Sequence, residues 1–435
     1  MSGGNLREVA AIVGIGHTDW PQDYARTRRG EKPFDSYGYA AVALKRALED
    51  CGLKAADVDG LIVGHMAYEH LRLTDWPFVV VPSERFCTFM ADRRRTAEDL
   101  RSLVANLSRR RPSSMHLLWS WVGAGKTHSL LYLKYLSGST PLTAVFTEFP
   151  KTARTYADVV RQLARALPLE LVANQYLEVV THPRWDDRLH PEPDFQRAAR
   201  VLVSGTDVAS RIAARWLVGE ELSAPDLRSI GLTRYLKDSD DGIRYVSSLV
   251  GLLGNPMASS SWRLIWMIDE FQRLETLPPG ARSQILSSLH STFNACPDDF
   301  TAIVSFSGKP ASKLPKWLTP ELADRIGLEQ TIVLPPLSRT EAVGFLRDVL
   351  QHFREPGHRG NQDFPFEDGA LEQVVSWVEK TGELKPRALM QYANAVLEVA
   401  DRQIGRGELD VISCAVVDGV LRERRPLLER DEDEE

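Results

Sequence analysis

Residues 115–130 have the sequence MHLLWSWVGAGKTHSL, and this stretch decides the fold. An apolar strand at 116–119 leads into a turn of small residues, then into Gly125-Lys126-Thr127 and a helix-forming run. This order is the context that a phosphate-binding loop requires, because N–H groups of the turn and the positive end of the helix surround a phosphate. We expect Lys126 to reach the β- and γ-phosphates of ATP and Thr127 to ligate Mg²⁺.

The loop departs from the usual pattern G-x-x-x-x-G-K-[ST] at its first position, where Ser120 replaces glycine. A serine is small enough to make the turn, so we expect a working loop with a slightly altered exit from the strand. The residues expected to bind the nucleotide are Ser120, Gly123, Ala124, Gly125, Lys126, Thr127 and His128.

A second stretch, RLIWMIDE at 263–270, predicts a buried strand that ends in two acids. Asp269 at the strand tip is expected to hold the Mg²⁺ shell through water. Glu270 is expected to polarise the attacking water as a general base. Because this strand lies downstream of a phosphate-binding loop, the two stretches together predict nucleotide binding and hydrolysis.

Two further candidates follow this strand. Ser307, or its neighbour Ser305, ends a strand at 302–307. Its hydroxyl is expected to form a hydrogen bond with the attacking water or the γ-phosphate. The alternative is that this serine only caps the turn at the end of the strand. Arg325 ends a short helix (LTPELADRI), the place from which an arginine serves a neighbouring subunit's nucleotide. The alternative for Arg325 is a surface pair with Glu321.

The last part of the chain predicts helices at 340–353, 369–380 and 387–404. Ser338-x-x-Glu341 resembles a capping box at the first of them. Pro386 fits the first turn of the last. We expect Arg387 to contact the γ-phosphate and to couple the position of these helices to the nucleotide.

Strands alternating with helices predict an α/β fold with a parallel sheet: a three-layer P-loop NTPase followed by a small helical lid. The predicted division is residues 1–75, an ATPase core at 76–337 with a helical insertion at about 154–255, a lid at 338–405, and a C-terminal helix with an acidic tail at 406–435. Residues 84–110 are predicted to form a helix that precedes the first strand of the core.

Composition excludes several classes. The four cysteines are widely spaced, no run approaches the length of a membrane span, and no secretory signal is apparent, so we expect a cytoplasmic protein without membrane contact. The net charge of −6 gives no global attraction to nucleic acid. Arginines cluster before the loop, however, and this cluster is either ordinary solvated surface or a binding site for DNA. Its members are Arg93, Arg94, Arg95, Arg101, Arg109, Arg110 and Arg111.

The first residues carry a separate resemblance. AIVGIGHTDW and ALEDCGLKAADVDGLIVG, within residues 8–67, resemble the opening of thiolase-like acetyl-CoA acetyltransferases. Strands are predicted at 9–16 and 61–64, and a helix at 36–52 that ends at Gly52. Thiolase chemistry is not expected, because Cys87 lies outside the small-residue turn that such a nucleophile needs and no later catalytic half follows.

Residues 76–405 resemble AAA+ ATPases, and look most similar to the bacterial origin-recognition (Cdc6-like) and STAND-like ATP-binding proteins. The resemblance rests on the loop, the strand ending in Asp269-Glu270, LADRI and G-x-L-K-P-R in this order. It implies sensor-1, arginine-finger and sensor-2 roles for Ser307, Arg325 and Arg387. A looser likeness, through DEFQRL, is to ATP-binding proteins of bacterial DNA-associated and phage-defence systems.

The sequence therefore predicts an ATP-driven switch or motor subunit that acts on a partner protein or DNA, as a homo-oligomer or within a larger complex. The alternative is a nucleotide-binding scaffold that turns over little ATP and recruits effectors.

Overall fold

The sheet that organises the molecule consists of five parallel strands. A computed structural model describes residues 36–52, 54, 71–82, 84–91, 93–109, 112–182, 193–259, 261–308, 318–326, 330–355 and 361–428. The strands stand in the order β2-β3-β4-β1-β5. Their bounds are β1 Ser114–Ser120, β2 Leu142–Glu148, β3 Arg263–Asp269, β4 Phe300–Ser307 and β5 Thr331–Val333. The predicted parallel α/β sheet is confirmed.

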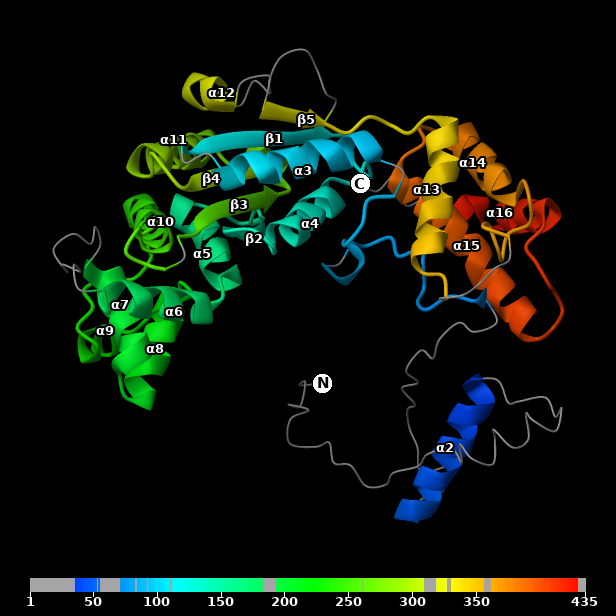
Figure 1. The fold of residues 1–435 in the computed structure, drawn as a ribbon, viewed down its shortest axis with the longest axis horizontal. Coiled ribbons are helices and arrows are strands. Elements are labelled where there is room, and N and C mark those ends of the chain that lie inside the picture. Colours follow the sequence, from blue (N-terminus) through cyan, green and yellow to red (C-terminus); the bar gives the residue numbers. More distant parts are fainter. Residues whose placement is uncertain are drawn as a thin grey trace.

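Helices cover both faces of the sheet, and alternate residues of each strand explain which face they meet (Figure 1). Met115, Leu117 and Trp119 of β1 belong to one apolar cluster, whereas Leu118 belongs to the other. The cluster around Leu118 includes α3 (Arg94–Arg109) and α4 (Lys126–Ser137). The opposite cluster includes α5 (Tyr156–Ala166), α10 (Ser239–Leu253), α11 (Pro279–Ala295) and α12 (Pro320–Ile326).

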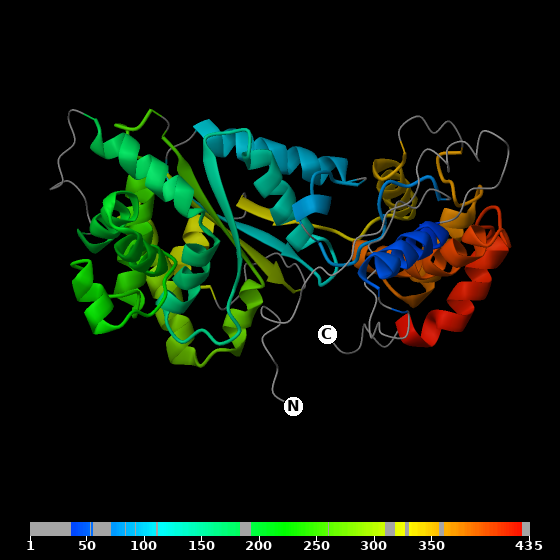
Figure 2. The same cartoon turned by 90° about the horizontal axis from the view of Figure 1, so that it is seen from below.

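The segment between β2 and β3 is helical, as predicted. Besides α5 and α10 it contains α6 (Leu169–Val180), α7 (Pro193–Ser204), α8 (Asp207–Leu217) and α9 (Ala224–Ser229). Ser223 caps α9 by accepting the N–H of Asp226. These helices extend the molecule on the side away from its C-terminal helices in both views (Figures 1 and 2).

The C-terminal bundle, helices α13–α16, has a core of its own. Its members are α13 (Arg339–His352), α14 (Ala370–Thr381), α15 (Pro386–Gly405) and α16 (Cys414–Leu428). The expected capping box is present, since Ser338 and Glu341 satisfy each other's backbone N–H groups. Helix α16, which follows the predicted lid, packs into the same apolar cluster through Val417 and Leu421.

The residues that precede the sheet join this bundle rather than a long helix. Leu71, Leu73 and Phe78 belong to the apolar cluster of the bundle. A backbone hydrogen bond also joins this segment to the bundle: the N–H of Thr74 donates to the Phe353 carbonyl at the end of α13 (2.7 Å). The helix predicted at 84–110 is wrong in its first part: only η4 (Glu84–Phe86) and α3 are helical, and residues between them bury side chains such as Cys87 instead.

Near the N-terminus the predicted helix is present as α2 (Ser36–Cys51), and Gly52 follows it with a positive φ of 69°. The strands predicted at 9–16 and 61–64 lie outside the described residues, as does most of the thiolase-like segment. Among the described helices none is long and apolar enough to span a membrane.

Candidate functional site

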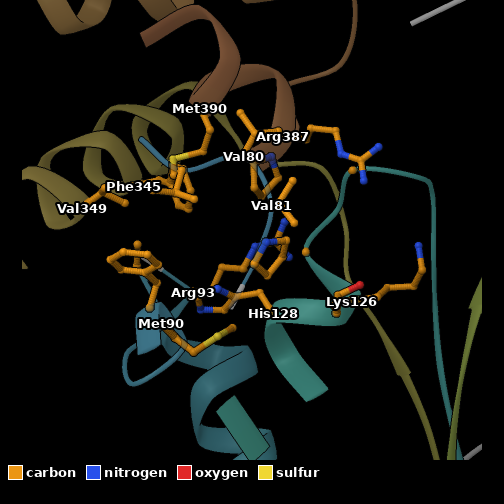
Figure 3. Close-up of a pocket in the computed structure, with 18 of the residues that line it drawn as sticks. Val80, Val81, Met90, Arg93, Lys126, His128, Phe345, Val349, Arg387 and Met390 are labelled. Carbon is orange, nitrogen blue, oxygen red and sulfur yellow. The ribbon is translucent and has the colours of Figure 1, made fainter. Parts of the chain in front are cut away.

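A pocket lies where the carboxyl edge of the sheet meets the C-terminal bundle (Figure 3). Three parts of the chain line it: the glycine loop after β1 with the start of α4, the strand tips at Glu270 and Ser307, and bundle residues of α13 and α15. A fourth part closes it, residues 77–82, 84–91 and 93, which we call the strap. Parallel sheets bind ligands at this edge, so the location fits a ligand site.

The glycine loop has the backbone geometry that a phosphate-binding loop needs. Gly123 and Gly125 adopt φ of 77° and 94°, which side chains other than hydrogen rarely tolerate. Lys126 is buried, and its Nζ donates to the carbonyls of Trp121 (2.8 Å) and Ser120 (3.3 Å). Burial lowers the pKa of Lys126 to about 8, although Asp269 and Glu270 oppose the shift. An anion at the loop would therefore find a poorly solvated cation.

Ser120 has a structural role that accounts for the departure from glycine. It is fully buried, and its hydroxyl donates to the carbonyl of Leu334, just after β5. The Ser120 carbonyl in turn accepts the N–H of Gly308 after β4 (3.0 Å). Ser120 thus ties the exit of β1 to both neighbouring strands, and Ala124 packs beneath the loop with 2% of its surface exposed.

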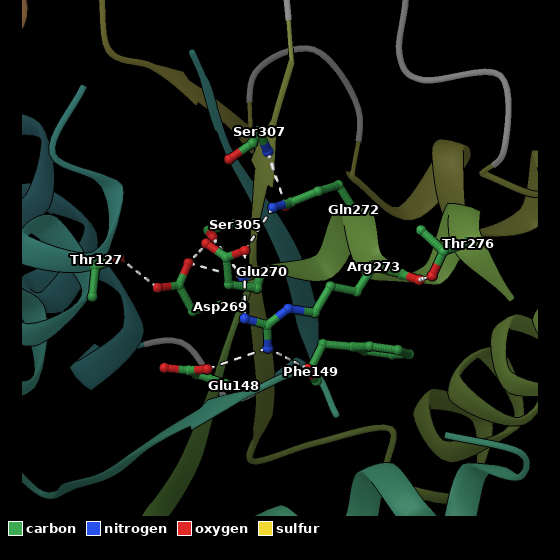
Figure 4. Close-up of polar contacts among 10 residues, drawn as sticks. All are labelled: Thr127, Glu148, Phe149, Asp269, Glu270, Gln272, Arg273, Thr276, Ser305 and Ser307. Atoms are coloured by element: carbon green, nitrogen blue, oxygen red, sulfur yellow. Dashed lines mark hydrogen bonds and ion pairs between the residues drawn. The ribbon is translucent and has the colours of Figure 1, made fainter. Parts of the chain in front are cut away.

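The predicted metal ligands lie together at the tip of β3 (Figure 4). The Thr127 hydroxyl donates to Oδ2 of Asp269 (2.6 Å), while the Ser305 hydroxyl donates to Oδ1. Asp269 is 2% exposed, so these contacts fix its orientation. Of the two candidate serines, Ser305 is buried and holds the Asp269 carboxylate, whereas Ser307 lines the pocket.

Glu270 also lines the pocket, in an unusual conformation held by residues that the sequence analysis did not single out. Its φ of 58° is left-handed, which is rare for glutamate. Its Oε2 accepts the side-chain N–H of Gln272 (2.9 Å) and lies 3.7 Å from a guanidinium nitrogen of Arg273.

Gln272 connects the two strand tips. While its amide nitrogen donates to Glu270, its Oε1 accepts the backbone N–H of Ser307 (3.1 Å). Arg273 continues the network to the end of β2, since it donates to the Phe149 carbonyl (2.8 Å) and to Glu148 (3.2 Å). The motif DEFQRL contained both residues, but only the fold reveals that they turn back onto Glu270.

The bundle contacts the glycine loop directly through the first turn of α15. Pro386 is the first residue of this helix, as predicted, and the N–H of Arg387 donates to the Gly123 carbonyl (3.2 Å). The Arg387 side chain lines the pocket. Nζ of Lys385 lies 5.8 Å from the centre of the Trp121 ring. The positive end of a second helix therefore meets the loop beside that of α4.

His128 joins the loop helix to the strap. Its Nε2 is 2.8 Å from the Phe89 carbonyl, so this nitrogen must be the donor, and Nδ1 lies 3.3 Å from the Cys87 sulfur. Burial lowers the pKa of His128, and the nearby Arg93 adds to this shift, so the ring is neutral at pH 7.

The strap connects this helix to the bundle as well. The Phe89 ring stacks on His352 of α13 (3.8 Å between centroids, 15° between planes) and meets His128 edge-on. The sequence of this segment offers one signal, the proline-bounded apolar run at 77–82 that follows the predicted start of the ATPase core at residue 76. The structure makes it one wall of the pocket.

Arg325 lies apart from the pocket. Its guanidinium donates to Asn294 (2.7 Å) and lies 5.2 Å from the centre of the Phe293 ring, both at the end of α11. The end of α11 leads into the start of β4, and therefore lies at the amino ends of the parallel strands. The glycine loop follows β1 at the carboxyl ends of the same strands. The structure thus gathers the other predicted residues at one edge and places Arg325 at the other.

No family model matches the chain, and no curated protein matches its sequence. Similar solved structures include the ORC1 protein of Aeropyrum pernix in complex with DNA, with 14% identity over 80% of this chain and 69% of that one and a TM-score of 0.44. The Aeropyrum pernix ORC2 protein, in complexes with ADPNP and ADP, is 16% identical over 76% and 67%, with a TM-score of 0.45. Domain III of the Thermotoga maritima replication initiation protein DnaA is 13% identical over 82% and 95%, with a TM-score of 0.38.

The thiolase-like resemblance of residues 8–67 finds no support.

Proposed function

We propose that this chain binds ATP in the pocket and hydrolyses it, as a switch or motor subunit that acts on a partner protein or on DNA. The observation that carries the proposal is the convergence of Lys126, the Asp269-Glu270 strand tip and Arg387 on one pocket. Binding, hydrolysis and a contact to a separate helical bundle are what a nucleotide-driven switch needs.

The phosphates would lie on the glycine loop. A triphosphate would offer Lys126 anionic acceptors in place of the two loop carbonyls that it now contacts. Arg387 lines the pocket from the bundle side and is proposed to contact the γ-phosphate. Glu270 is the proposed general base, and Ser307 the proposed contact to the attacking water or γ-phosphate.

Mg²⁺ fits the residues at the tip of β3. The Thr127 hydroxyl and Asp269 carboxylate are hard oxygen donors in contact with each other. The described residues contain no group of three or more acidic, histidine or cysteine side chains that could hold a metal ion by itself, so phosphates and waters would complete the shell. When bound, the ion would neutralise charge on the phosphates.

Arg325 is proposed to contact the nucleotide bound by a second copy of the chain. It lies at the amino ends of the strands, where it cannot reach the pocket of its own chain. DNA is proposed as a partner of the exposed arginines at the start of α3, Arg94 and Arg95. Arg93 does not belong to that surface, because it is 8% exposed, and Arg110 and Arg111 lie outside the described residues.

The alternative is a nucleotide-binding scaffold with little turnover. One observation favours it: the Glu270 carboxylate is already engaged by Gln272 and Arg273. The carboxylate that would have to accept a proton from the attacking water is thereby occupied. A partner that releases these contacts would convert the scaffold into an ATPase.

Turnover by purified protein, with and without duplex DNA, separates the two. Glu270→Gln should lower kcat about 100-fold or more while ATP still binds, since general base catalysis contributes about that much. Lys126→Ala should weaken ATP binding severely, because it removes the buried cation of the loop. The matched control Glu275→Gln changes an exposed glutamate of the same segment and should have no effect. ATP binding without turnover in the wild type, alone or with DNA, would establish the scaffold instead.

A further inference from the structure

Arg93 is a buried cation in the pocket wall that has no assigned task. It lines the pocket, and 8% of its surface is exposed. One guanidinium nitrogen donates to the Pro335 carbonyl (3.1 Å). Its Nε–H, also buried, has no hydrogen-bond partner among the residues that the structure describes. Buried donors are nearly always satisfied, so an unmet one in a pocket wall indicates an acceptor on the ligand.

The electrostatics strengthen this reading of Arg93. Burial lowers its pKa to about 10, and Glu341 at the start of α13 only partly offsets the shift. The guanidinium is still charged at pH 7, and a desolvated charge whose Nε–H lacks an acceptor is costly. A ligand that supplies an acceptor to Nε would recover part of this cost on binding.

Arg93 does not face the phosphate end of the pocket, as we call the part lined by Gly125, Lys126 and Arg387. Figure 3 draws it beside His128 and Met90, whereas the amine of Lys126 and the guanidinium of Arg387 lie on the opposite side. The neighbouring wall is apolar and comes from the strap and the bundle, including Val80, Phe345 and Val349. Such walls fit the flat faces of a base, and a single polar group among them sets its orientation.

We propose that Nε–H of Arg93 donates a hydrogen bond to a ring nitrogen of a purine base, and that Arg93 thereby selects the nucleotide. Purine ring nitrogens are acceptors at the edge of the base and lie in its plane, where a donor from a side wall can reach them. The proposal rests on the proposed nucleotide-binding function and adds the group that recognises the base.

The decisive experiment changes the ligand rather than the protein. Affinities of wild-type protein would be measured for ATP and for 1-deaza-, 3-deaza- and 7-deaza-ATP, each of which lacks one ring nitrogen. One analogue should bind about tenfold or more weakly, as expected for a hydrogen bond to a charged donor. Equal affinity for all four nucleotides would overturn the proposal.

Protein variants then assign the loss to Arg93. In Arg93→Met the sensitive analogue and ATP should bind equally, and affinity for tripolyphosphate should stay at the wild-type value. The control Arg95→Met, an exposed arginine at the start of α3, should discriminate as the wild type does. If Arg93→Met weakens tripolyphosphate as much as ATP, Arg93 serves the phosphates or the fold and the proposal is wrong.

Two failures remain distinguishable. A wild type that binds no ATP removes the proposed function and this inference together. A wild type that binds ATP through Lys126 but ignores all ring nitrogens removes only this inference. Melting curves without nucleotide would identify an Arg93→Met protein that is merely unfolded, and the wild-type deaza series does not depend on that variant.

Discussion

The two ends of the pocket are built in opposite ways. At the phosphate end, polar groups come from strand tips and a glycine loop that the sheet holds in register, and buried hydrogen bonds connect Thr127, Asp269 and Ser305. At the other end the wall is apolar and comes from the strap, α13 and α15, which lie far apart in the chain. Phe89 is where these parts meet, between His128 of α4 and His352 of α13.

This difference indicates which end of the pocket is rigid and which end can change when the bundle moves. Most of the phosphate end is built on the sheet and its glycine loop, and the bundle contributes Arg387, so a nucleotide's phosphates would meet a largely fixed surface. The apolar end exists only while the strap and the bundle keep their positions against α4. A change in the bundle should therefore alter the apolar end first, and the following predictions test whether the two ends can be separated.

The largest expected effect belongs to the phosphate end and depends on pH. A bound triphosphate favours charged Lys126, whose pKa burial lowers to about 8 in the free protein. The amine loses its proton as pH rises through that value, so affinity for a non-hydrolysable ATP analogue should fall by up to about tenfold per pH unit above it. Titrations between about pH 7 and about pH 9.5 would measure this. In Lys126→Ala the slope should vanish, and an unchanged slope there would assign it to another group.

The next effect concerns catalysis without binding. Gln272→Leu removes the bridge between Glu270 and Ser307, and kcat should fall about tenfold to 100-fold because a misplaced catalytic group costs about that much. The dissociation constant of ATP should not change. Gln351→Leu, on the exposed side of α13, is the control. A rise in kcat would mean instead that Gln272 restrains Glu270, as the scaffold alternative requires.

A smaller effect is expected at the apolar end. Phe89→Ala removes the ring between His128 and His352 and should lower ATP affinity about fivefold to tenfold, in line with the value of aromatic pairs. Affinity for tripolyphosphate should not move. Tyr135→Ala removes an exposed aromatic ring of α4 and serves as control. Equal losses for both ligands would show that the two ends are not separable.

The smallest effect concerns the unusual first residue of the loop. Ser120→Gly restores the common pattern but removes the bond to the Leu334 carbonyl, so it should lower the free energy of unfolding by about 1–3 kcal/mol. ATP affinity should change little. Urea unfolding would measure the loss, with Ser139→Gly in an exposed turn as control. A large gain in affinity would mean that serine impairs the loop.

The residues that gather at the proposed phosphate end could be predicted from the sequence, because each part of it has a local signal. Gly125-Lys126-Thr127 is recognised from the turn and helix that immediately surround it, and Asp269 is recognised from its position at the end of an apolar strand. Parallel pairing then brings these tips to one edge without further information. The predicted strands and the helices of the C-terminal bundle follow the same logic, since their apolar periodicity is local.

The apolar end could not be predicted in this way. The strap has no periodicity, and residues 87–93 were assigned to a helix although the described residues there are not helical and Cys87 and Phe89 contact His128 and the bundle. Likewise Gln272 and Arg273 acquire their partners only because η6 (Phe271–Thr276) turns back toward β4 and β2. Such contacts depend on tertiary geometry, and spacing along the chain does not encode them.

The hydrogen bond from the N–H of Arg387 to the Gly123 carbonyl has a thermodynamic consequence. It joins the backbone of α15 to the loop itself, so the bundle cannot move away from the loop without breaking it. Whatever binds the bundle and favours one position of α15 would then alter nucleotide affinity by some factor. By linkage the nucleotide must alter the affinity of that partner by the same factor, so a measurement of either one yields the other.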